Sequence, residues 1–350
     1  MDLESLGWNE FFSAHFEQYE GEGLVPARVA VEHHGFYELA GVDGRLGGIP
    51  SGRLKFGGEE PAVGDWVAVE RVEGERKAVI QAVLPRRTKF VRKEPWRRTV
   101  VQIVAANIDG VFLVAGLDGD FKVRRLERYL TAAWESGAEP VVVLTKRDLA
   151  DDVDERVAEA EAVAFGVPVH AVSNVSGEGL DELERYLQPA RTVALLGSSG
   201  VGKSTLANCF LGHEVLKTAA LRADGRGRHT TTRRQLVQLP GGALLLDTPG
   251  LRELQLWAGE DSLDETFADV TELAAHCRFN DCSHRTEPGC AVQAALAAGT
   301  LAPERWDSHR RLQRELRALA IRKDQRLRAE AKKNMRRFAR DRRRLSERDL

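Results

Sequence analysis

One octapeptide constrains the fold of this chain more than any other stretch. Residues 197–204 read Gly-Ser-Ser-Gly-Val-Gly-Lys-Ser, which satisfies the G-x-x-x-x-G-K-[ST] pattern of a P-loop. The apolar run 191–196 predicts a short buried strand before it, and residues 204–211 predict a helix after it. This context is required because the loop amides and the helix N-terminus bind phosphate together. The sequence therefore favours an α/β nucleotide-binding domain over a glycine-rich turn that fits the pattern by accident.

The P-loop pattern gives two side chains distinct roles. Lys203 is expected to reach the β- and γ-phosphates, and the Ser204 hydroxyl is expected to bind Mg²⁺. The glycines let the backbone wrap the anion so that several N–H groups point inward. The predicted phosphate-binding residues are Gly197, Ser198, Ser199, Gly200, Val201, Gly202, Lys203, Ser204 and Thr205.

A short motif downstream supplies an acid. Residues 247–250 read Asp-Thr-Pro-Gly and close an apolar strand predicted at 243–246. The Asp247 carboxylate is then expected near Mg²⁺, and Gly250 is expected beside the nucleotide. A β-turn aspartate is the alternative interpretation of the tetrapeptide taken alone.

Two motifs before the P-loop predict which base the nucleotide carries. Residues 145–148, Thr-Lys-Arg-Asp, and residues 173–177, Ser-Asn-Val-Ser-Gly, each follow an apolar strand. In GTPases such a tetrapeptide offers its carboxylate to the guanine N1 and exocyclic amine, a donor pair that adenine lacks, and a serine loop closes over the base. Alone, the tetrapeptide is an ordinary strand-to-helix turn, but beside the other motifs it predicts guanine binding. The residues concerned are Thr145, Lys146, Asp148 and Ser173.

From Val101 onward the chain alternates apolar strands with amphipathic helices. This alternation predicts a parallel sheet covered on both faces. We expect strands at residues 110–115, 139–144, 167–172, 192–196, 236–239 and 243–246. We expect helices at residues 123–136, 153–165, 179–187 and 203–211.

The N-terminal part has a different pattern. Residues 24–84 contain short β-like runs separated by glycine-rich turns, which predict a small barrel of the OB type. A nucleic-acid binder and a structural adaptor are both compatible with such a barrel. Residues 1–20 form an amphipathic lead-in that is either helical or poorly ordered. Strands of the barrel are expected at residues 25–31, 36–40, 66–72 and 77–83.

Basic stretches flank the α/β region. In residues 85–100, arginines and lysines are interleaved with Phe90 and Trp96, which could hold RNA by phosphate contacts and stacking; a solvated linker is the alternative. Residues 302–350 predict one or two helices whose apolar face packs. Their basic remainder is either an arm that orders on RNA or a solvated helix. The apolar face comprises Trp306, Leu312, Leu316 and Leu319.

Charge distribution and hydropathy narrow the class of protein. The chain of 350 residues has 51 Lys and Arg against 53 Asp and Glu, and its basic excess lies at the C-terminal end, which favours contact with nucleic acid. No apolar run approaches the roughly 20 residues of a membrane span. The first residues lack the pattern of a signal peptide. We therefore expect a cytoplasmic protein with no membrane partner.

Three of the four cysteines, Cys277, Cys282 and Cys290, crowd into one short stretch. Together with the imidazole of His284 or His276, three thiolates close a tetrahedral shell, which predicts a structural rather than a catalytic zinc site. Independent core cysteines are the alternative. The turn-forming residues between the cysteines suit a metal-bound loop better than a core helix.

The order of the motifs resembles that of a circularly permuted GTPase: base tetrapeptide, serine loop, P-loop, threonine-rich stretch and Asp-Thr-Pro-Gly. With a β-barrel before them and a C-x4-C-x-H-x5-C pattern after them, the chain resembles the RsgA family of GTPases that depend on the small ribosomal subunit. The resemblance extends from about residue 24 to at least residue 290. It selects His284 as the fourth zinc ligand. Two positions depart from the usual GTPase pattern, because Thr145 replaces Asn, which predicts a weaker contact to the base or the P-loop, and Asn174 replaces a small Ala.

The resemblance implies a multidomain fold: an N-terminal OB-fold barrel, an α/β P-loop GTPase domain in permuted motif order and a C-terminal α-helical zinc-binding domain. It implies GTP hydrolysis stimulated by the small (30S) ribosomal subunit, with contacts to its 16S rRNA, late in subunit maturation. One structural Zn²⁺ per chain and Mg²⁺ with GTP are the implied cofactors, and a monomer is expected. The expected division is residues 1–23 (extension), 24–85 (barrel), 86–255 (GTPase domain) and 256–350 (zinc-binding domain with a basic helical arm).

The threonine-rich residues 226–232 predict a switch in which Thr231 or Thr232 approaches Mg²⁺ and the γ-phosphate. Leu251 occupies the place where Ras-like enzymes carry a water-orienting glutamine, so we predict slow intrinsic turnover. The candidate catalytic residue is His229, because imidazole can hydrogen-bond water near neutral pH. A phosphate-binding or solvated histidine is the alternative, as is charge stabilisation by the neighbouring Arg226 or Arg228.

Two other functions use the same motifs. A nucleoside kinase or ATPase would use the same P-loop. Nucleotide competition would distinguish it from a GTPase, because Asp148 predicts binding of GTP and GDP with little binding of ATP. An RNA-binding scaffold would hold nucleotide only structurally, and would differ by showing no turnover on ribosomal subunits.

Overall fold

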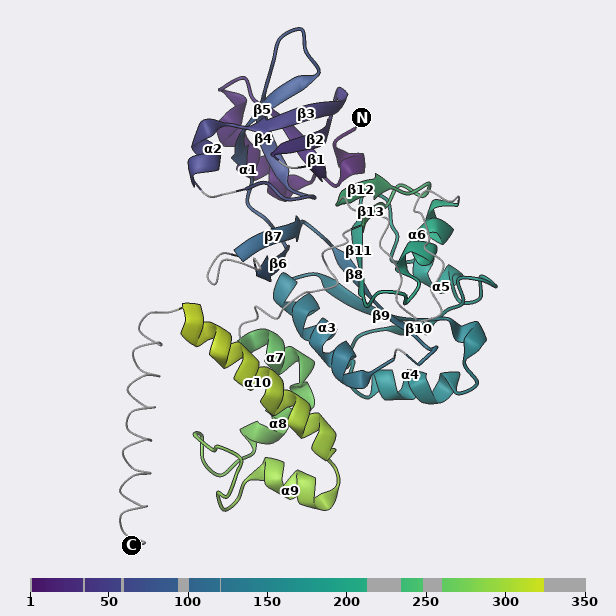
Figure 1. Cartoon of the computed structure of the whole chain (residues 1–350). Helices are drawn as coiled ribbons and strands as arrows, with labels where there is room; N and C mark the ends of the chain where they lie inside the picture. Colours follow the sequence, from purple (N-terminus) through teal and green to yellow (C-terminus); the bar gives the residue numbers. More distant parts are fainter. Residues whose placement is uncertain are drawn as a thin grey trace, which may run out of the picture. The chain divides into compact units, whose positions relative to one another are not determined.

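Figure 1 shows the computed structural model of the chain. By packing, the chain divides into two compact units, Met1–Arg92 with Gln102–Gln255, and Lys93–Val101 with Leu256–Leu350. The structure describes residues 2–33, 35–57, 60–93, 101–119, 121–212, 234–247 and 260–323.

Five strands in the first unit close into a barrel. Their order is β1-β2-β3-β5-β4, and β4 pairs again with β1 to complete the ring. Every pair is antiparallel except β3 with β5, and the short helix α2 (Gly52–Gly57) lies between β3 and β4 in sequence. This arrangement confirms the predicted OB-type barrel. The strands are β1 (Val25–His33), β2 (Phe36–Gly41), β3 (Gly44–Pro50), β4 (Trp66–Arg71) and β5 (Lys77–Val83).

Strand β3 was not among the predicted strands. Its glycines have a packing role. A Cβ at Gly47 would lie 2.9 Å from the Phe36 ring, and one at Gly48 would lie 2.7 Å from Leu39 Cδ1. Side chains of β2 therefore lie over β3, and only residues without a Cβ leave room for them.

The N-terminal lead-in is helical. Helix α1 (Glu10–Glu20) begins after Asn9, whose side chain accepts the N–H of Phe11 at 3.1 Å and caps the helix. Its buried face places Phe12 5.8 Å from the ring of Trp66 in β4. A three-residue 3₁₀ turn, Glu4–Leu6, precedes it. The amphipathic pattern is thus used to cover the barrel core.

The α/β part has a six-strand sheet in the order β10-β9-β8-β11-β13-β12. The first five strands are parallel and β12 is antiparallel to β13. Every residue of β11 is buried, as a sheet covered on both faces requires. The predicted sheet covered on both faces is confirmed, but the strand expected at residues 236–239 is antiparallel rather than parallel. The strands are β8 (Gly110–Gly116), β9 (Glu139–Thr145), β10 (Val169–Ala171), β11 (Thr192–Gly197), β12 (Gln235–Gln238) and β13 (Leu244–Asp247).

Two of the four predicted helices are shorter than expected. The bounds of α3 (Val123–Ser136) and α6 (Lys203–Leu211) agree with the prediction, whereas α4 (Val153–Glu161) and α5 (Asp181–Glu184) are truncated. Gly179 has φ +76°, so it cannot begin a right-handed helix, and α5 starts two residues later. The segment after α4 continues as turns in which Val163, Ala164 and Val167 pack in the core, whereas Phe165 is exposed.

The barrel and the α/β sheet are continuous. Val31 of β1 pairs with Gln235 of β12, which joins both into one 11-stranded sheet. Arg28, also on β1, is fully buried and donates to the Thr192 hydroxyl at 2.9 Å and to the Asn107 carbonyl at 3.0 Å. Burial lowers the pKa of Arg28 to about 10, although the carboxylates of Asp109 and Asp65 oppose the shift. The strand that leads to the P-loop is thereby tied to the barrel.

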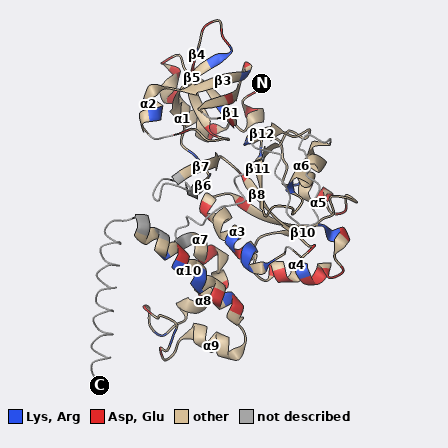
Figure 2. Cartoon of the chain, in the orientation of Figure 1, with Lys and Arg blue, Asp and Glu red and all other residues tan. Residues whose placement is uncertain are grey.

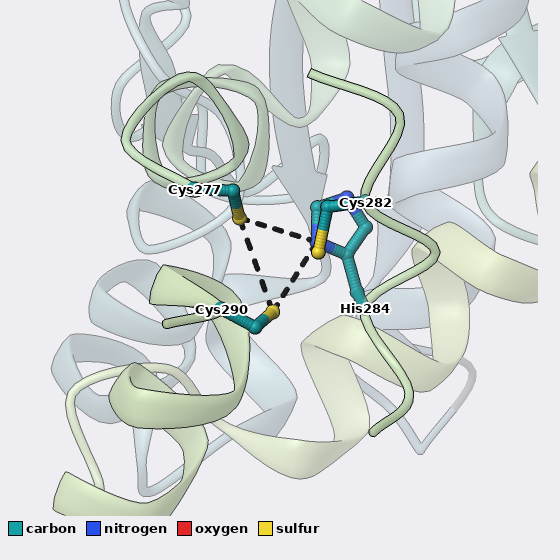
Figure 3. A group of neighbouring side chains, drawn as sticks. All are labelled: Cys277, Cys282, His284 and Cys290. Carbon is teal, nitrogen blue, oxygen red and sulfur yellow. Dashed lines mark hydrogen bonds between the residues drawn. The ribbon is translucent and has the colours of Figure 1, made fainter. Parts of the chain in front are cut away.

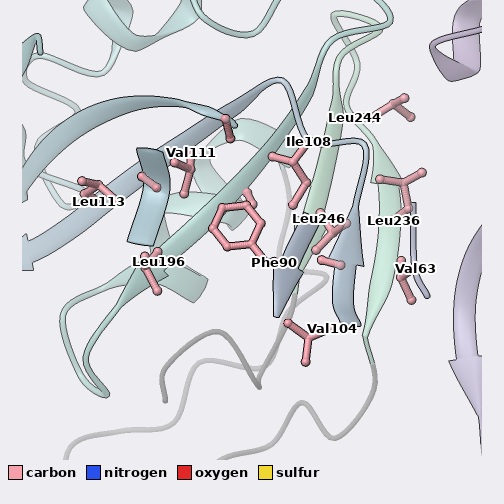
Figure 4. Packing of buried hydrophobic residues seen from close by; sticks show 14 of the residues in the cluster. Val63, Phe90, Val104, Ile108, Val111, Leu113, Leu196, Leu236, Leu244 and Leu246 are labelled. Carbon is pink, nitrogen blue, oxygen red and sulfur yellow. The ribbon is translucent and has the colours of Figure 1, made fainter. Parts of the chain in front are cut away.

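The predicted basic connector is largely structural. Strand β6 (Lys89–Lys93) pairs with β7 (Val101–Ala106), and Phe90 is only 2% exposed among residues such as Val104 and Ile108 (Figure 4). Arg86 binds the buried Asp65 carboxylate at 2.7 Å. The expectation that Phe90 stacks on RNA was therefore wrong, because the ring completes the core instead. Trp96 lies outside the described residues.

The described part of the second unit is helical. Arg305 of its longest helix donates to the Asp269 carboxylate and to the Thr266 carbonyl, both at 2.8 Å. On the same helix Leu312 and Leu316 are buried, as predicted, whereas the side chain of Leu319 and residues 324–350 lie outside the described part. No described helix is long and apolar enough to cross a membrane. The helices are α7 (Glu260–Thr266), α8 (Ala268–Ala275), α9 (Ala291–Ala298) and α10 (Pro303–Lys323).

Candidate nucleotide and metal sites

The P-loop lies between the end of β11 and the start of α6. Gly200 and Gly202 have φ of +85° and +90°, a region that favours glycine. A Cβ at Gly197 would overlap the carbonyl oxygen of Val114 on the neighbouring strand. The motif glycines are therefore required by the backbone path.

Lys203 folds back over this loop. Its Nζ donates to the Gly197 carbonyl at 2.8 Å and to the Ser198 carbonyl. Ser204 and Thr205 follow in the first turn of α6. The cation and the helix N-terminus thus lie on one short loop, which is the arrangement that binds a polyphosphate.

The predicted base-recognition residues lie together at the ends of β9 and β10. Asp148 belongs to a 3₁₀ turn, Arg147–Leu149, and its Oδ1 accepts the Ser173 hydroxyl at 2.6 Å. Ser173 is buried, and its oxygen also accepts the N–H groups of Val175 at 3.2 Å and Ser176 at 3.1 Å. The serine therefore holds the carboxylate and its own loop in one arrangement at the carboxyl edge of the sheet, where α/β folds bind ligands.

Lys146 has a partner that the sequence did not reveal. It adopts φ +62°, and its Nζ donates to the carboxylate of Asp118, in the loop after β8. Asp118 lies 28 residues before Lys146, and only the adjacency of β8 and β9 brings them together.

The base loops also contact the P-loop. The Thr145 hydroxyl donates to the Val201 carbonyl at 2.5 Å, and Asn174 Nδ2 donates to the Gly202 carbonyl at 3.1 Å. The sequence predicted a weaker P-loop contact at Thr145. The structure places the shorter side chain within hydrogen-bonding distance, and Asn174 adds a second contact.

A further pair of side chains supports the P-loop from α3. Arg125 Nη1 donates to the Ser198 hydroxyl at 2.6 Å, and the Tyr129 hydroxyl lies 3.3 Å from the same oxygen. Figure 2 shows the basic residues along α3. Sequence reasoning missed this pair, although the four-residue spacing of Arg125 and Tyr129 places both on one face of a helix.

Several predicted residues lie outside the described part. These are the switch residues His229, Thr231 and Thr232, together with Gly250 and Leu251. Asp247 ends β13, which is parallel to β11, so its backbone lies at the same edge of the sheet as the P-loop.

The second unit gathers three cysteines and one histidine (Figure 3). One ligand atom from each of the four lies within 4.8 Å of the others. Sγ of Cys277 is 3.9 Å from Sγ of Cys290, and both are 3.5 Å from Nδ1 of His284. Tetrahedral zinc with bonds of about 2.3 Å to sulfur and about 2.0 Å to nitrogen would separate two sulfurs by about 3.8 Å and sulfur from nitrogen by about 3.5 Å. The donor set and its spacing fit zinc.

The structure also chooses between the two histidines. His276 ends α8, and its Nδ1 lies 2.8 Å from the Glu272 carbonyl of the same helix. His284 adopts φ +54° in the loop before α9, and its ring joins the three thiols.

Hydrogen bonds favour a thiolate at Cys277. Burial raises the pKa of the Cys277 thiol, but the N–H groups of Ala291 and Val292 and the thiols of Cys290 and Cys282 together lower that pKa below its ordinary value. Cys290 caps α9 by accepting the N–H of Gln293 at 3.4 Å.

Glu287, which the sequence did not single out, and Trp306, which it assigned only to an apolar helix face, organise the metal loop. The Glu287 carboxylate accepts the N–H groups of Ser283 at 3.0 Å and Arg285 at 2.9 Å. Hydrogen bonds, chiefly from the Ser283 hydroxyl, lower the pKa of Glu287 to about 2. The rings of Trp306 and His284 pack nearly perpendicular to each other, with their centroids 5.7 Å apart. No spacing rule predicts such support, because it depends on how the loop and α10 meet.

Comparison with known proteins identifies relatives over most of the chain. A profile of the family described as RsgA GTPase matches residues 83–257. A protein of Opitutus terrae named small ribosomal subunit biogenesis GTPase RsgA is 50% identical over 330 residues, which cover 90% of each chain. A protein of the same name from Syntrophotalea carbinolica is 46% identical over 328 residues, again 90% of each chain.

Comparison with solved structures gives the same result as comparison of sequences. The crystal structure of YjeQ from Thermotoga maritima has a TM-score of 0.64 and 28% identity, and the match covers 84% of this chain and 98% of that one. YloQ, described as a circularly permuted GTPase, has a TM-score of 0.59 at 23% identity over 84% of this chain and 96% of its own. The likeness to YloQ shows the shared fold.

Proposed function

Because the chain belongs to the RsgA family of GTPases, we propose that it hydrolyses GTP to GDP and phosphate in the biogenesis of the small (30S) ribosomal subunit. The observation that carries this proposal is the meeting of three motifs at one sheet edge. Asp148 and Ser173 are hydrogen-bonded to each other, and both loops that bear them contact the P-loop through Thr145 and Asn174.

We assign the selection of guanine to Asp148. A carboxylate presents two acceptor oxygens to the paired donors of guanine N1 and its exocyclic amine. Lys203, released from the loop carbonyls, would bind the β- and γ-phosphates. The amides of the loop 197–202 and the start of α6 would hold the remaining phosphate oxygens.

Mg²⁺ fits the residues at the sheet edge. The Ser204 residue lies in the first turn of α6, and the backbone of Asp247 ends the strand beside β11, so both residues belong to the sheet edge where the phosphates would lie. Bound there, the ion would neutralise charge on the β- and γ-oxygens. Thr231 or Thr232 would complete its shell when the switch orders.

Turnover is proposed to be slow until the subunit binds. Leu251 cannot orient the attacking water, and we assign that task to His229, with Arg226 and Arg228 as the alternative source of charge stabilisation. Hydrolysis on the subunit would then trigger release of the protein late in maturation.

One structural Zn²⁺ per chain is part of the proposal. Four protein ligands would close the tetrahedron and would leave no open position for substrate. The metal would fix the loop 277–290 against α9 and α10.

The barrel, the zinc-binding region and the basic C-terminal arm are proposed to contact 16S rRNA. Exposed arginines of α10 lie opposite its buried leucines and suit phosphate contacts. We propose a division into residues 1–23 (extension), 24–85 (barrel), 86–255 (GTPase domain) and 256–350 (zinc-binding domain with the basic arm). We also propose that the protein is a monomer and that it works in the cytoplasm. The exposed arginines are Arg310, Arg311, Arg314 and Arg317.

The test is GTP turnover by the full chain with purified small subunits, with large subunits and with neither. Stimulation by small subunits alone is expected, with GDP but not ATP competing. The Asp148→Asn variant should lose its preference for guanine over adenine nucleotides. Equal turnover in all three conditions would contradict the role on the small subunit, and unchanged base preference in the variant would show that the base pocket lies elsewhere.

A further inference from the structure

The first part of the chain, to which the proposed function gives no role, lies where the barrel meets the α/β part. We propose that residues 3–20, the N-terminal strap, hold this joint closed and fix the orientation of the barrel relative to the sheet that carries the P-loop. The inference goes beyond the proposed function, because it concerns how the two parts are joined rather than what the nucleotide site does.

The strap packs on the barrel through aromatic rings. The ring of Trp8 lies 4.7 Å from that of Trp66 in β4, at an interplanar angle of 74°. The ring of Phe12 in α1 lies 5.8 Å from the same indole, and both Phe12 and Trp66 are buried. Rings in edge-to-face pairs attract each other beyond the gain from burial. The strap is therefore attached to the wall of the barrel.

One buried guanidinium connects the strap to both sides of the joint. Arg28 of β1 donates to the Leu6 carbonyl of the strap and, at 3.2 Å, to the Gly64 carbonyl in the barrel. It also donates to the Asn107 carbonyl at 3.0 Å and to the Thr192 hydroxyl at 2.9 Å, both in the α/β part. Removing a charge from water is costly unless its donors are paired. The strap carbonyl is thus one of the partners that keep Arg28 inside the joint.

The backbone of the strap approaches both sides of the joint at Gly7. This residue ends the 3₁₀ turn with φ +88°, a region that favours glycine. A Cβ here would lie 2.8 Å from Arg28 Nη1, on the barrel side, and 3.0 Å from the Ala190 carbonyl oxygen, two residues before β11. Only a residue without a side chain lets the strap fit between them.

The strap also belongs to a core that both parts share. Its residues Leu6, Phe12 and Phe16 are 4% exposed or less, and they lie in one apolar cluster with residues of the barrel and of the α/β part. These other members include Trp66, Leu84, Ile108, Val111 and Leu113. Opening the joint would expose apolar surface of this cluster to water, and the hydrophobic effect opposes such exposure.

Backbone pairing across the joint is narrow by comparison. Among the described residues, β1 and β12 pair at Val31 and Gln235 alone. The N–H of Ala106, at the end of β7, donates to the Val63 carbonyl of the barrel at 3.0 Å. Hydrogen bonds at isolated points hold two parts together but oppose rotation between them only weakly. We therefore expect the packing of the strap to supply much of the resistance to rotation.

A fixed barrel matters for any partner that contacts the barrel and the α/β part at once. Association costs less conformational entropy when both surfaces are already held in the bound arrangement. For the small subunit this consequence rests on the proposed function. Loosening the strap should weaken binding of the subunit by about 10-fold and leave the affinity for GDP unchanged.

Two glycines form a matched pair for the test. Gly7→Ala places a methyl group against Arg28 and Ala190. Gly23→Ala, at φ +73°, meets nothing within 4 Å. Both substitutions strain the backbone in a similar way, so their difference measures the contact at the joint. In the full chain, hydrogen exchange at Ala106 should be about 10-fold faster in Gly7→Ala than in Gly23→Ala, as expected for the loss of about one hydrogen bond to a charged group.

Other amides locate the effect. The Glu32 N–H donates to the Arg234 carbonyl at 3.4 Å across the joint and should also exchange faster. The Leu84 N–H donates to the Trp66 carbonyl at 2.9 Å inside the barrel and should keep its rate. GDP affinity should be equal in both variants. Pelleting with small subunits at one salt concentration should show the 10-fold loss only in the Gly7→Ala protein.

A second measurement leaves every native residue in place. A protease recognition sequence inserted between the exposed residues Gly21 and Glu22 allows the link between the strap and β1 to be cut in the folded full chain. After the freed strap is removed by dilution and filtration, the amides at the joint should exchange faster. Adding a peptide of residues 1–21 should restore their rate, and a scrambled peptide of the same composition should not.

The results separate the strap from simpler roles. Equal exchange at Ala106 in the two glycine variants would overturn the proposal. Exchange that rises at Leu84 as much as at Ala106 would show that the strap only covers the barrel, which also overturns its role at the joint. Should Gly7→Ala fail to fold, the cut chain and its peptide decide instead. If the joint responds as expected but the unsubstituted chain does not bind the small subunit, the proposed function fails and the strap stands.

Discussion

The residues that shape the nucleotide site mostly contact backbone atoms. Thr145, Asn174 and Lys203 all donate to carbonyls of the P-loop, and Ser173 accepts two N–H groups of its own loop. The backbone C=O and N–H groups of these loops are present whatever residues the loops contain. Whether each hydrogen bond forms therefore depends on the side chain that bonds to them.

Lys203→Ala should abolish productive GTP hydrolysis, by about 100-fold or more, because it removes the cation for the β- and γ-phosphates. The fold should persist, since the side chain is only partly buried and fills no core volume. Turnover with saturating small subunits and a thermal melt would check both statements. A folded variant with full turnover would contradict the assignment of the P-loop.

At the scale of elements, the short helices of the second unit depend on the metal loop between them. Cys290 caps the N-terminus of α9, and Trp306 of α10 packs against His284. Helices of eight residues are marginal without tertiary contacts. Metal binding is therefore expected to supply much of the folding free energy of this region.

Cys282→Ala, or removal of zinc with a chelator, should unfold the region around residues 277–290 first. The nucleotide site should still bind GDP, because it belongs to the other packing unit. Hydrogen exchange of α9 and α10, compared with that of α6, would reveal the selective loss. Protein purified without chelator that contains no zinc and has three freely reactive thiols in this region would rule out the metal site.

His309 makes the second unit sensitive to acid. The ring stacks on Trp306 at 5.4 Å, and its burial, with a smaller effect of the Arg305 charge, lowers the pKa of His309 to about 4. Between pH 4 and the ordinary pKa of about 6.5, the unfolded chain binds the extra proton and the folded chain does not. Stability is therefore lost as the pH falls from about 6.5 to about 4, by up to about 3 kcal/mol.

His309→Phe keeps an aromatic ring beside Trp306 and removes the titrating group. The variant should lose less stability than the unsubstituted chain between pH 7 and pH 5, as measured by melting the zinc-loaded protein at both values. The difference between the two proteins isolates the histidine from proton competition at the zinc ligands, which both share. An identical loss in both would show that other groups cause the acid sensitivity.

At the scale of the whole molecule, one sheet joins the barrel to the nucleotide-binding part. The pairing of β1 with β12 and the buried Arg28 connect the barrel to strand β11, which ends in the P-loop. The permuted order also places the Asp-Thr-Pro-Gly motif directly before the zinc-binding region in sequence. Only a short stretch of chain therefore separates the motif that we expect to respond to the nucleotide from the zinc-binding region that we propose to bind RNA.

We expect tighter binding to the small subunit with a non-hydrolysable GTP analogue than with GDP. A γ-phosphate can favour the bound state only through a difference in affinity, and linkage then requires the subunit to favour GTP equally, commonly by about 5- to 150-fold. Pelleting with subunits at one fixed salt concentration measures the difference. Binding should also weaken as salt is raised if arginine and lysine contacts to phosphates dominate. Equal affinity in both nucleotide states would refute the switch even if hydrolysis were confirmed.

The sequence by itself determined the elements and the chemistry that short motifs carry. The P-loop glycines, the alternation of strands and helices and the cysteine spacing are local requirements of backbone path, burial and ligand number, so they can be read along the chain. The strands β8, β9 and β11 and the helices α3 and α6 agree with their predicted ranges to within a residue. The same local reasoning did not predict β3, because its glycines leave room for side chains of the neighbouring strand β2.

The tertiary structure decided what depends on residues far apart in sequence. Phe90 became core rather than an RNA contact, because β6 and β7 bring it against Ile108. The contacts of Thr145 and Asn174 with the P-loop, of Arg125 with Ser198 and of Trp306 with His284 arise only where strands and helices meet. Their distances are set by packing, and no periodicity along one segment encodes a contact whose other half lies in another element.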